Sequence, residues 1–213
     1  MPLKISLSVG GLLLVASLAT GLHTQSPAAA ASAAAKAEAP YVPAYTPDGR
    51  LLYPEHYREW VFLSSGVDMS YNPKAMAAGH TVFDNVFVNP EAYAKFVQTG
   101  TWPDKTVLVL EARMGMEKGS INHQGHYQGT DLMGFEVHVK DEARFPGKWA
   151  FFDFDSPVSG GSLFPKDAAC YSCHADHAAV DTTFVQFYPT LLPIAKEKKT
   201  LSANYLKEEA AAK

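Results

Sequence analysis

The chain has 213 residues with 18 basic and 22 acidic side chains, a formal net charge of −4 and only two cysteines. A chain of this length buries a sizeable core without disulfides, so the two cysteines are free for chemistry. The slight acidic excess argues against a nucleic-acid-binding protein, which needs a basic face to neutralise phosphates. With 47% hydrophobic and 12% aromatic residues, the composition excludes collagen-like, coiled-coil and disordered chains and predicts one globular domain.

The two ends of the chain differ in composition from its centre. Residues 1–39 contain a basic start, an apolar stretch over 5–22 and an alanine-rich run over 28–35. This pattern predicts a secretory signal peptide with an alanine-rich spacer, and the alternative is an uncleaved membrane anchor. Both predict an exported, periplasmic protein. Residues 196–213 are charged and poor in aromatics, which predicts a charged tail after a domain formed by residues 40–195.

The clearest helix is predicted at residues 90–99. Asn89 is a favoured N-cap residue, and Pro90 suits the first helical position because its fixed φ matches the helix and its missing N–H is not needed there. Glu91 adds an acid to the first turn, and Gly100 is a typical residue at which a helix ends. These signals together define both ends of the helix.

Four segments are predicted to be strands, at residues 82–88, 106–112, 135–140 and 148–154. They are rich in β-branched and aromatic residues, and the third alternates between apolar and polar side chains. The turn at 144–147 joins the last two strands into a hairpin. The sequence therefore predicts an α+β domain with a predominantly antiparallel β-sheet and a few short helices.

The motif that carries chemistry is CYSCH at residues 170–174, a C-x-x-C-H pentapeptide typical of covalent haem attachment. In such a motif each thiol adds to one haem vinyl group, and the adjacent histidine binds the iron. Cys170 and Cys173 are therefore predicted to form the thioethers and His174 to be the proximal iron ligand. The chain has no second cysteine pair, so a single haem c is predicted, in a C-terminal attachment segment.

The two cysteines admit three other interpretations. A disulfide between Cys170 and Cys173 would close a very short loop and contribute little stability. A thioredoxin-like redox pair normally follows an early strand of a βαβ unit, which this sequence does not predict. A zinc site would recruit His177 to the pair, although structural zinc usually uses two separate ligand pairs. Export also favours haem, because covalent haem attachment takes place outside the cytoplasm.

The sixth coordination position of the iron decides between functions. An electron carrier fills it with a strong ligand, typically methionine or histidine, whereas a gas-binding or catalytic haem leaves it open. The candidates for a sixth ligand are Met69, Met114, Met116, Met133, His80, His123 and His126.

The chain resembles the cytochrome P-460 family and its relatives, the cytochromes c′-β, over nearly all of residues 41–193. Besides the haem pentapeptide, the similar segments are YREWV (57–61), VFVNPEAY (86–93), GTWPD (100–104), TVLV (106–109), VKD (139–141), RFPG (144–147), WAFF (149–152) and FYP (187–189). The resemblance implies a homodimer with a largely antiparallel fold. It also implies a histidine-ligated, five-coordinate iron that takes small diatomic or nitrogen-oxide ligands.

Family members that oxidise hydroxylamine carry an additional covalent bond between the haem and a lysine directly before a glutamate. The resemblance places Leu110 at that position, and leucine has no amine with which to bond the porphyrin. Lys105 lies an odd number of residues away and would point to the other face of a strand. Lys118 lies in a glycine-containing turn and stays a second candidate for a cross-link.

The resemblance also places three residues on the distal side of the haem. Leu110 and Phe83 would form an apolar cap, which favours neutral ligands such as NO and CO. Glu136 aligns with a carboxylate that the family is thought to use for proton transfer. The family's distal arginine has no counterpart, because Asp84 or its neighbour stands there.

The leading hypothesis is a periplasmic monohaem c-type cytochrome with an open distal site that binds NO or a related nitrogen oxide. The first alternative is an oxidoreductase acting on hydroxylamine or peroxide, with Glu136 as proton relay. The second is a single-haem electron carrier that works with a redox partner protein.

Overall fold

The computed structural model describes residues 39–69, 79–117 and 123–212. The predicted signal peptide and Lys118 lie outside the described residues. The folded unit is Ala39–Lys213. None of the helices in the described part of the chain is long and apolar enough to cross a membrane.

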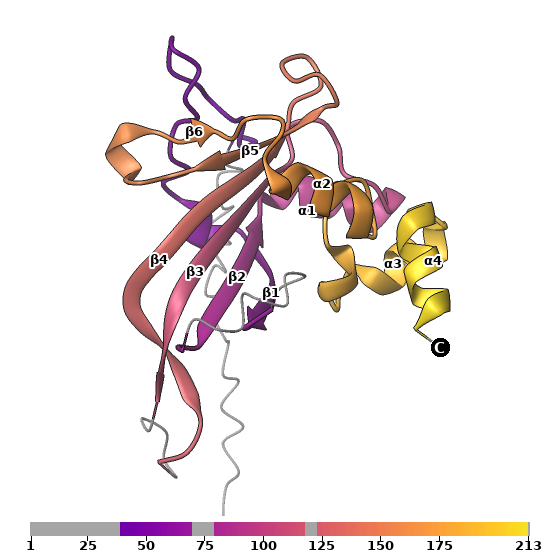
Figure 1. Cartoon of the computed structure of the whole chain (residues 1–213). Coiled ribbons are helices and arrows are strands. Elements are labelled where there is room, and N and C mark those ends of the chain that lie inside the picture. The colour runs from indigo at the N-terminus through magenta and orange to yellow at the C-terminus, as the bar shows by residue number, and fades with distance from the viewer. Residues whose placement is uncertain (1–38, 70–78, 118–122, 213) are drawn as a thin grey trace, which may run out of the picture. The chain divides into compact units, whose positions relative to one another are not determined.

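A six-stranded sheet forms the centre of the folded unit, and its strands follow one another in space in sequence order (Figure 1). Every neighbouring pair is antiparallel, which suits the direct connections between successive strands. The prediction of an α+β domain with a mostly antiparallel sheet is confirmed. The strands are β1 (Val61–Val67), β2 (Val82–Val88), β3 (Val107–Glu117), β4 (His126–Lys140), β5 (Trp149–Asp153) and β6 (Ser162–Leu163).

Most helices follow the sheet in the sequence. Helix α1 forms as predicted and ends at Gly100, whose φ of 74° lies in the left-handed region that glycine adopts at little cost. The Asn89 side chain does not cap this helix; its Oδ1 instead accepts a hydrogen bond from the backbone N–H of Val107 and ties the helix to β3. The helices are η1 (Tyr57–Glu59), α1 (Pro90–Thr99), η3 (Pro157–Ser159), α2 (Ala169–His177), η4 (Val185–Phe187), α3 (Leu192–Lys198) and α4 (Ala203–Ala211).

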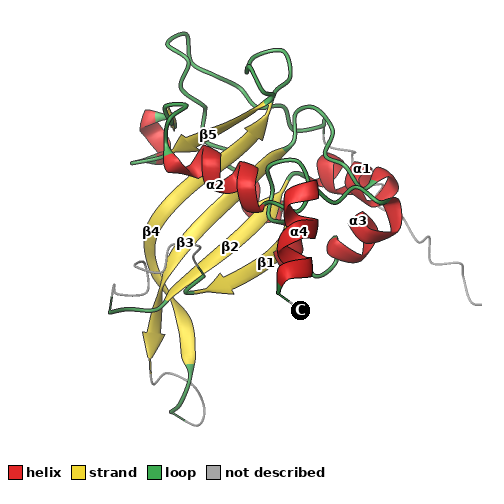
Figure 2. Ribbon diagram, turned by 45° about the vertical axis from the view of Figure 1, so that its right-hand side comes forward, coloured by secondary structure: helices red, strands yellow, loops and turns green. Residues whose placement is uncertain are grey.

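Alternation along the strands gives the sheet two different faces. On β3, Val107 and Val109 point to one face, which the aromatic N-terminal segment around Tyr57 covers. Leu108 points to the other face, where helices α1 and α3 and the residues around η4 complete a second core. Figure 2 shows α2 lying across the strands on this helical side. The haem-attachment motif is thus held against one face of the sheet.

The segment predicted as a charged tail belongs to the folded unit. Residues 203–211 form α4, and the Ser202 side chain accepts a hydrogen bond from the backbone N–H of Tyr205 at its start. The Ser202 hydroxyl also donates to the Ala178 carbonyl just after α2, and the Tyr205 ring packs on the helical core. Composition missed this helix because one aromatic ring and a serine cap are enough to hold it in place.

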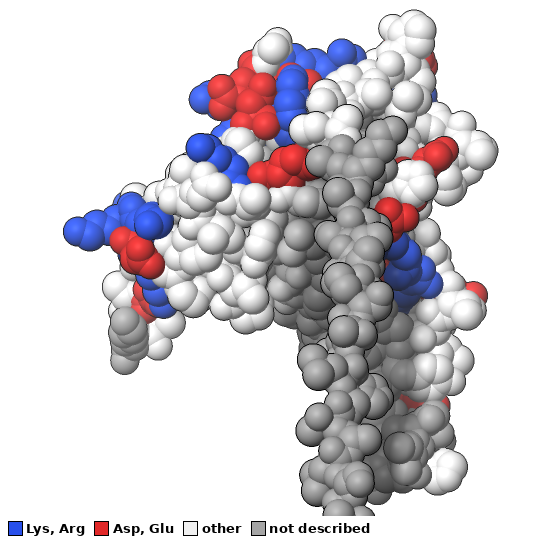
Figure 3. Space-filling view, turned by 180° about the vertical axis from the view of Figure 1, so that it is seen from behind, with Lys and Arg blue, Asp and Glu red and all other residues white. Residues whose placement is uncertain are grey.

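The hairpin of β3 and β4 extends beyond the other strands (Figure 1). Its outer part was not predicted, because residues 113–134 contain glycines and polar side chains that interrupt the alternation, and the register shifts twice near Arg113. Four large apolar side chains on it are exposed: Met116, Tyr127, Leu132 and Met133. On the side of the molecule shown in Figure 3, acidic and basic side chains are mixed among uncharged surface.

Candidate haem site

Helix α2 presents the two cysteines and the histidine of the pentapeptide together. Cys170 and Cys173 are three residues apart and His174 is four from Cys170, so all three lie on one side of the helix. Both cysteines are free, half-buried thiols, and burial raises the pKa of each. The disulfide alternative is therefore not supported, and the donor set has the spacing that haem attachment requires.

The His174 ring is oriented by a hydrogen bond and by aromatic neighbours. Its Nδ1–H donates to the Thr182 carbonyl over 2.7 Å, and burial lowers the pKa of the ring to about 4, which keeps the imidazole neutral at ordinary pH. With the proton on Nδ1, the Nε2 lone pair is available to a metal, the arrangement usual for metal-binding histidines. The Phe184 and Phe151 rings lie 4.2 and 4.6 Å from the His174 ring, centre to centre.

A pocket of about 570 Å³ lies between this helical side and the sheet. Such a volume is within the range of about 300–1,000 Å³ usual for small-molecule and cofactor sites. The sheet wall consists mainly of aliphatic residues, and the opposite wall includes Cys173 and His174 with three aromatic side chains. The principal lining residues are Val86, Leu108, Leu110, Glu136, His138, Phe151, Cys173, His174, Phe184, Phe187 and Tyr188.

The register of the sheet decides which predicted distal residues reach the pocket. Leu110 lies on the pocket face, paired with Val86 on β2 and with Glu136 on β4. The prediction that Phe83 caps the haem beside Leu110 is wrong. Phe83 pairs with Arg113, so its side chain points to the other face of the sheet. Val86 takes its place beside Leu110.

The pocket also contains carboxylates. Glu136, Asp84 and Asp68 all line it, and neither lysine nor arginine is found among its described lining residues. Glu136 is exposed toward the cavity, and the protein around its carboxyl group partly desolvates it. This desolvation, with the nearby charges of Asp153 and Asp84, raises its pKa. Desolvation and the charge of Asp68 likewise raise the pKa of Asp84. Both carboxyl groups thus titrate closer to neutral pH than free ones.

His138 is a site residue that sequence reasoning missed. Alternation placed it on the face of Glu136, but its contacts come from β5 and from a segment 44 residues further along the chain. Its ring stacks on Phe151 at 3.9 Å, and its Nε2 lies 3.2 Å from the Thr182 hydroxyl, next to the carbonyl that His174 binds. Burial and the nearby His174 and Lys166 lower the pKa of His138 well below its ordinary value.

The pocket lining shows which of the candidate iron and zinc ligands lie near the haem-attachment motif. Of the methionines and histidines predicted as sixth ligands, Met69 lines the pocket, and its sulfur packs on Gly66 of β1. The zinc alternative is not supported, because His177, whose Nδ1 pairs with the Glu208 carboxylate, does not join Cys170 and Cys173 in a metal-binding cluster. No three metal-binding side chains gather anywhere in residues 39–69, 79–117 or 123–212.

The residues present fit a haem. Two thiols and a neutral histidine lie on one helix beside a largely apolar pocket of sufficient volume, and the histidine keeps its Nε2 available. Fold and site together define a haem protein with its attachment helix packed on an antiparallel sheet. The sequence model of the Cytochrome P460 family matches residues 54–185, and the chain belongs to this family, whose members are c-type haem proteins. No curated protein matches the chain.

Proposed function

We propose that this protein is a monohaem c-type cytochrome with a site open to nitric oxide or a related small nitrogen-oxide ligand. Thioethers from Cys170 and Cys173 would hold the single haem c, and His174 would bind the iron. The observation that carries the proposal is the position of Leu110 in the pocket wall. An aliphatic side chain stands there, and the resemblance to hydroxylamine-oxidising relatives assigns this position to the cross-linking lysine, so no covalent bond to the haem can form at this point.

The charge of the pocket supports a neutral ligand. Three carboxylates line it, and the described lining contributes no cation to balance them. Carboxylates at the pocket wall repel anions such as nitrite or azide when they are ionised. A neutral molecule such as NO does not meet this repulsion. Desolvation first, and then the charges of neighbouring carboxylates, raise the pKa values of Glu136 and Asp84.

The proposal includes export to the periplasm, pairing with a second copy of this chain and exchange of electrons with a redox partner protein. The signal-peptide pattern in residues 1–39 supports export. The exposed apolar side chains of the β3–β4 hairpin, among them Leu132 and Met133, offer a surface that a second copy would cover.

An absorption spectrum of the purified protein tests the open site. We expect a five-coordinate ferric haem and, after reduction, a new spectrum on addition of NO. A six-coordinate, low-spin haem that does not bind NO would overturn the proposal. In that case the spectrum of Met69→Ala identifies the reason: conversion to five-coordinate haem would show that Met69 supplies the sixth ligand and that the protein is an electron carrier.

Glu136 favours a second candidate function, the oxidation of hydroxylamine. A carboxylate in the pocket with a raised pKa can accept a proton on Oε as the bound molecule loses electrons to an external acceptor. If the protein is such an enzyme, Glu136→Gln will lower turnover about 100-fold, since the amide accepts no proton. Glu197→Gln, at an exposed acid of α3, is the control and should keep the rate. Equal turnover in the two variants would exclude Glu136 as proton acceptor.

A further inference from the structure

The carbonyl that orients His174 belongs to a tight turn after α2. Residues Val180 and Thr183 form an antiparallel bridge, with the Thr183 N–H donating to the Val180 carbonyl at 2.9 Å. Asp181 adopts a φ of 53° inside the turn, in the left-handed region that aspartate tolerates better than most residues. Thr182 follows, and its carbonyl accepts the His174 Nδ1–H. Any movement of this turn therefore moves the hydrogen bond of the proposed iron ligand.

Side chains from the loop between α1 and β3 and from the end of β4 hold the turn in place. The Trp102 Nε1–H donates to the Thr183 hydroxyl at 2.7 Å, and that hydroxyl donates in turn to the Val180 carbonyl at 2.8 Å. The Lys140 ammonium binds the Asp181 carboxylate at 3.4 Å. Two different residues of the turn are thus fixed by two side chains that lie outside it.

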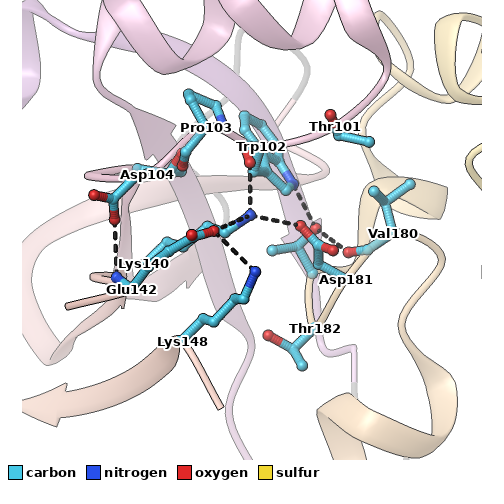
Figure 4. Close-up of polar contacts among 12 residues, drawn as sticks. Thr101, Trp102, Pro103, Asp104, Lys140, Glu142, Lys148, Val180, Asp181 and Thr182 are labelled. Atoms are coloured by element: carbon cyan, nitrogen blue, oxygen red, sulfur yellow. Dashed lines mark hydrogen bonds and ion pairs between the residues drawn. The ribbon is translucent and has the colours of Figure 1, made fainter. Parts of the chain in front are cut away.

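Trp102 and Lys140 also bind each other. The Lys140 Nζ donates to the Trp102 backbone carbonyl at 2.7 Å, and Figure 4 shows this ammonium between that carbonyl and the Asp181 side chain. The Lys140 residue is 7% exposed, and its ammonium lies 3.7 Å from the Glu142 carboxylate and 5.6 Å from the centre of the Trp149 ring. A buried ammonium is tolerated only where its donors find partners, so this lysine is tightly located.

We propose that Lys140 and Trp102 are positioning residues for His174. By holding the turn from two points, they keep the Thr182 carbonyl directed at Nδ1, which fixes the tautomer and ring orientation of His174 and raises the basicity of its Nε2. Partners of this kind, one step removed from the metal, commonly tune metal ligands in proteins. The inference rests on the proposed binding of iron by His174. It adds that Lys140 and Trp102, which lie outside the haem motif, control the strength of that bond.

The frequency of the iron–histidine stretching band in the reduced protein measures this control directly. We expect Lys140→Met to move the band to lower frequency and to broaden it, because a turn that Lys140 no longer holds at Asp181 does not keep the Thr182 carbonyl in one place. The reduction potential should rise at the same time, since a less basic imidazole stabilises ferric iron less. Trp102→Phe keeps the ring packing but removes the Nε1–H, and should shift the band in the same direction.

Lys105→Met is the matched control. Lys105 lies at the same end of the sheet, but it pairs with Asp141 and Asp104 and should leave the band unchanged. An unchanged band in both Lys140→Met and Trp102→Phe would overturn the proposal. If Lys140→Met fails to fold, the band of Trp102→Phe decides alone. His174→Gly separates this result from the proposed ligation: the band must vanish there, and its persistence would show that another residue binds the iron.

Discussion

Replacing both Cys170 and Cys173 with alanine is expected to abolish covalent haem attachment. These are the only cysteines of the chain, so no thiol remains to add to a vinyl group. Both side chains are half-buried and neither belongs to a core cluster, so the sheet should still fold. The measurement is the intact mass after denaturation, which should fall by one haem beyond the change due to the substitutions, together with loss of haem stain on a denaturing gel.

Each single variant should keep the haem bound through the other cysteine, with a shifted absorption band because one vinyl group stays unsaturated. Ser172→Ala is the control on the same helix: the Ser172 hydroxyl only donates to the Ala169 carbonyl, so attachment should be complete. Covalent haem that persists in the double variant would contradict thioether attachment as the sole bond. Such a result would indicate a covalent bond between the haem and a lysine, for which Lys118 is the remaining candidate.

Local patterns predicted the parts of the fold that local physics determines. Helix α1 carries its start and end signals within about a dozen residues, and the alternating segment at 135–140 needed only its own sequence to be recognised as a strand. The outer half of the β3–β4 hairpin was missed, because glycines and polar residues interrupt its pattern and backbone pairing alone continues the ladder. Helix α4 was missed because its support comes from Ala178, far back in the sequence.

The site residues also divide into those that local sequence predicts and those that depend on contacts between distant parts of the chain. Cys170, Cys173 and His174 were predicted from five adjacent residues, and the structure places them on one helix beside a pocket. Phe83 was placed on the wrong side of the sheet because the predicted cap ignored strand register, and a shift of one residue reverses the face. The contact between Lys140 and Asp181 joins residues 41 positions apart, so no local sequence pattern predicts it.

Among the substitutions proposed here, Glu111→Leu, next to Leu110, is expected to cause the largest loss of stability. Glu111 is fully buried on the face opposite the pocket, where it accepts hydrogen bonds from Tyr57, Arg58 and Arg113. The Arg58 and Arg113 nitrogens each approach its carboxylate to 2.6 Å. Leucine would leave these donors without their acceptor. Breaking a buried ion pair by removing one partner costs about 3–5 kcal/mol.

That loss is large against a total stability of about 5–15 kcal/mol. Chemical denaturation measures it, and Glu197→Leu, which removes an exposed partner of Lys198, should cost about 1 kcal/mol or less. An equal cost in the two variants would show that the buried network contributes nothing specific.

Acid provides a second test of the same carboxylate. Burial by itself would raise the pKa of Glu111, but the hydrogen bonds from Arg113 and Tyr57 and the two guanidinium charges outweigh it and lower the pKa. Because the folded pKa lies below the unfolded value of about 4.3, the contribution of the charge is complete above that value and is lost as pH falls through the folded pKa. Glu111→Gln lacks this charge at every pH. The stability advantage of the natural protein over Glu111→Gln should therefore be constant near neutral pH and shrink below about pH 4. A constant advantage down to the acid transition would show that Glu111 does not titrate with a lowered pKa.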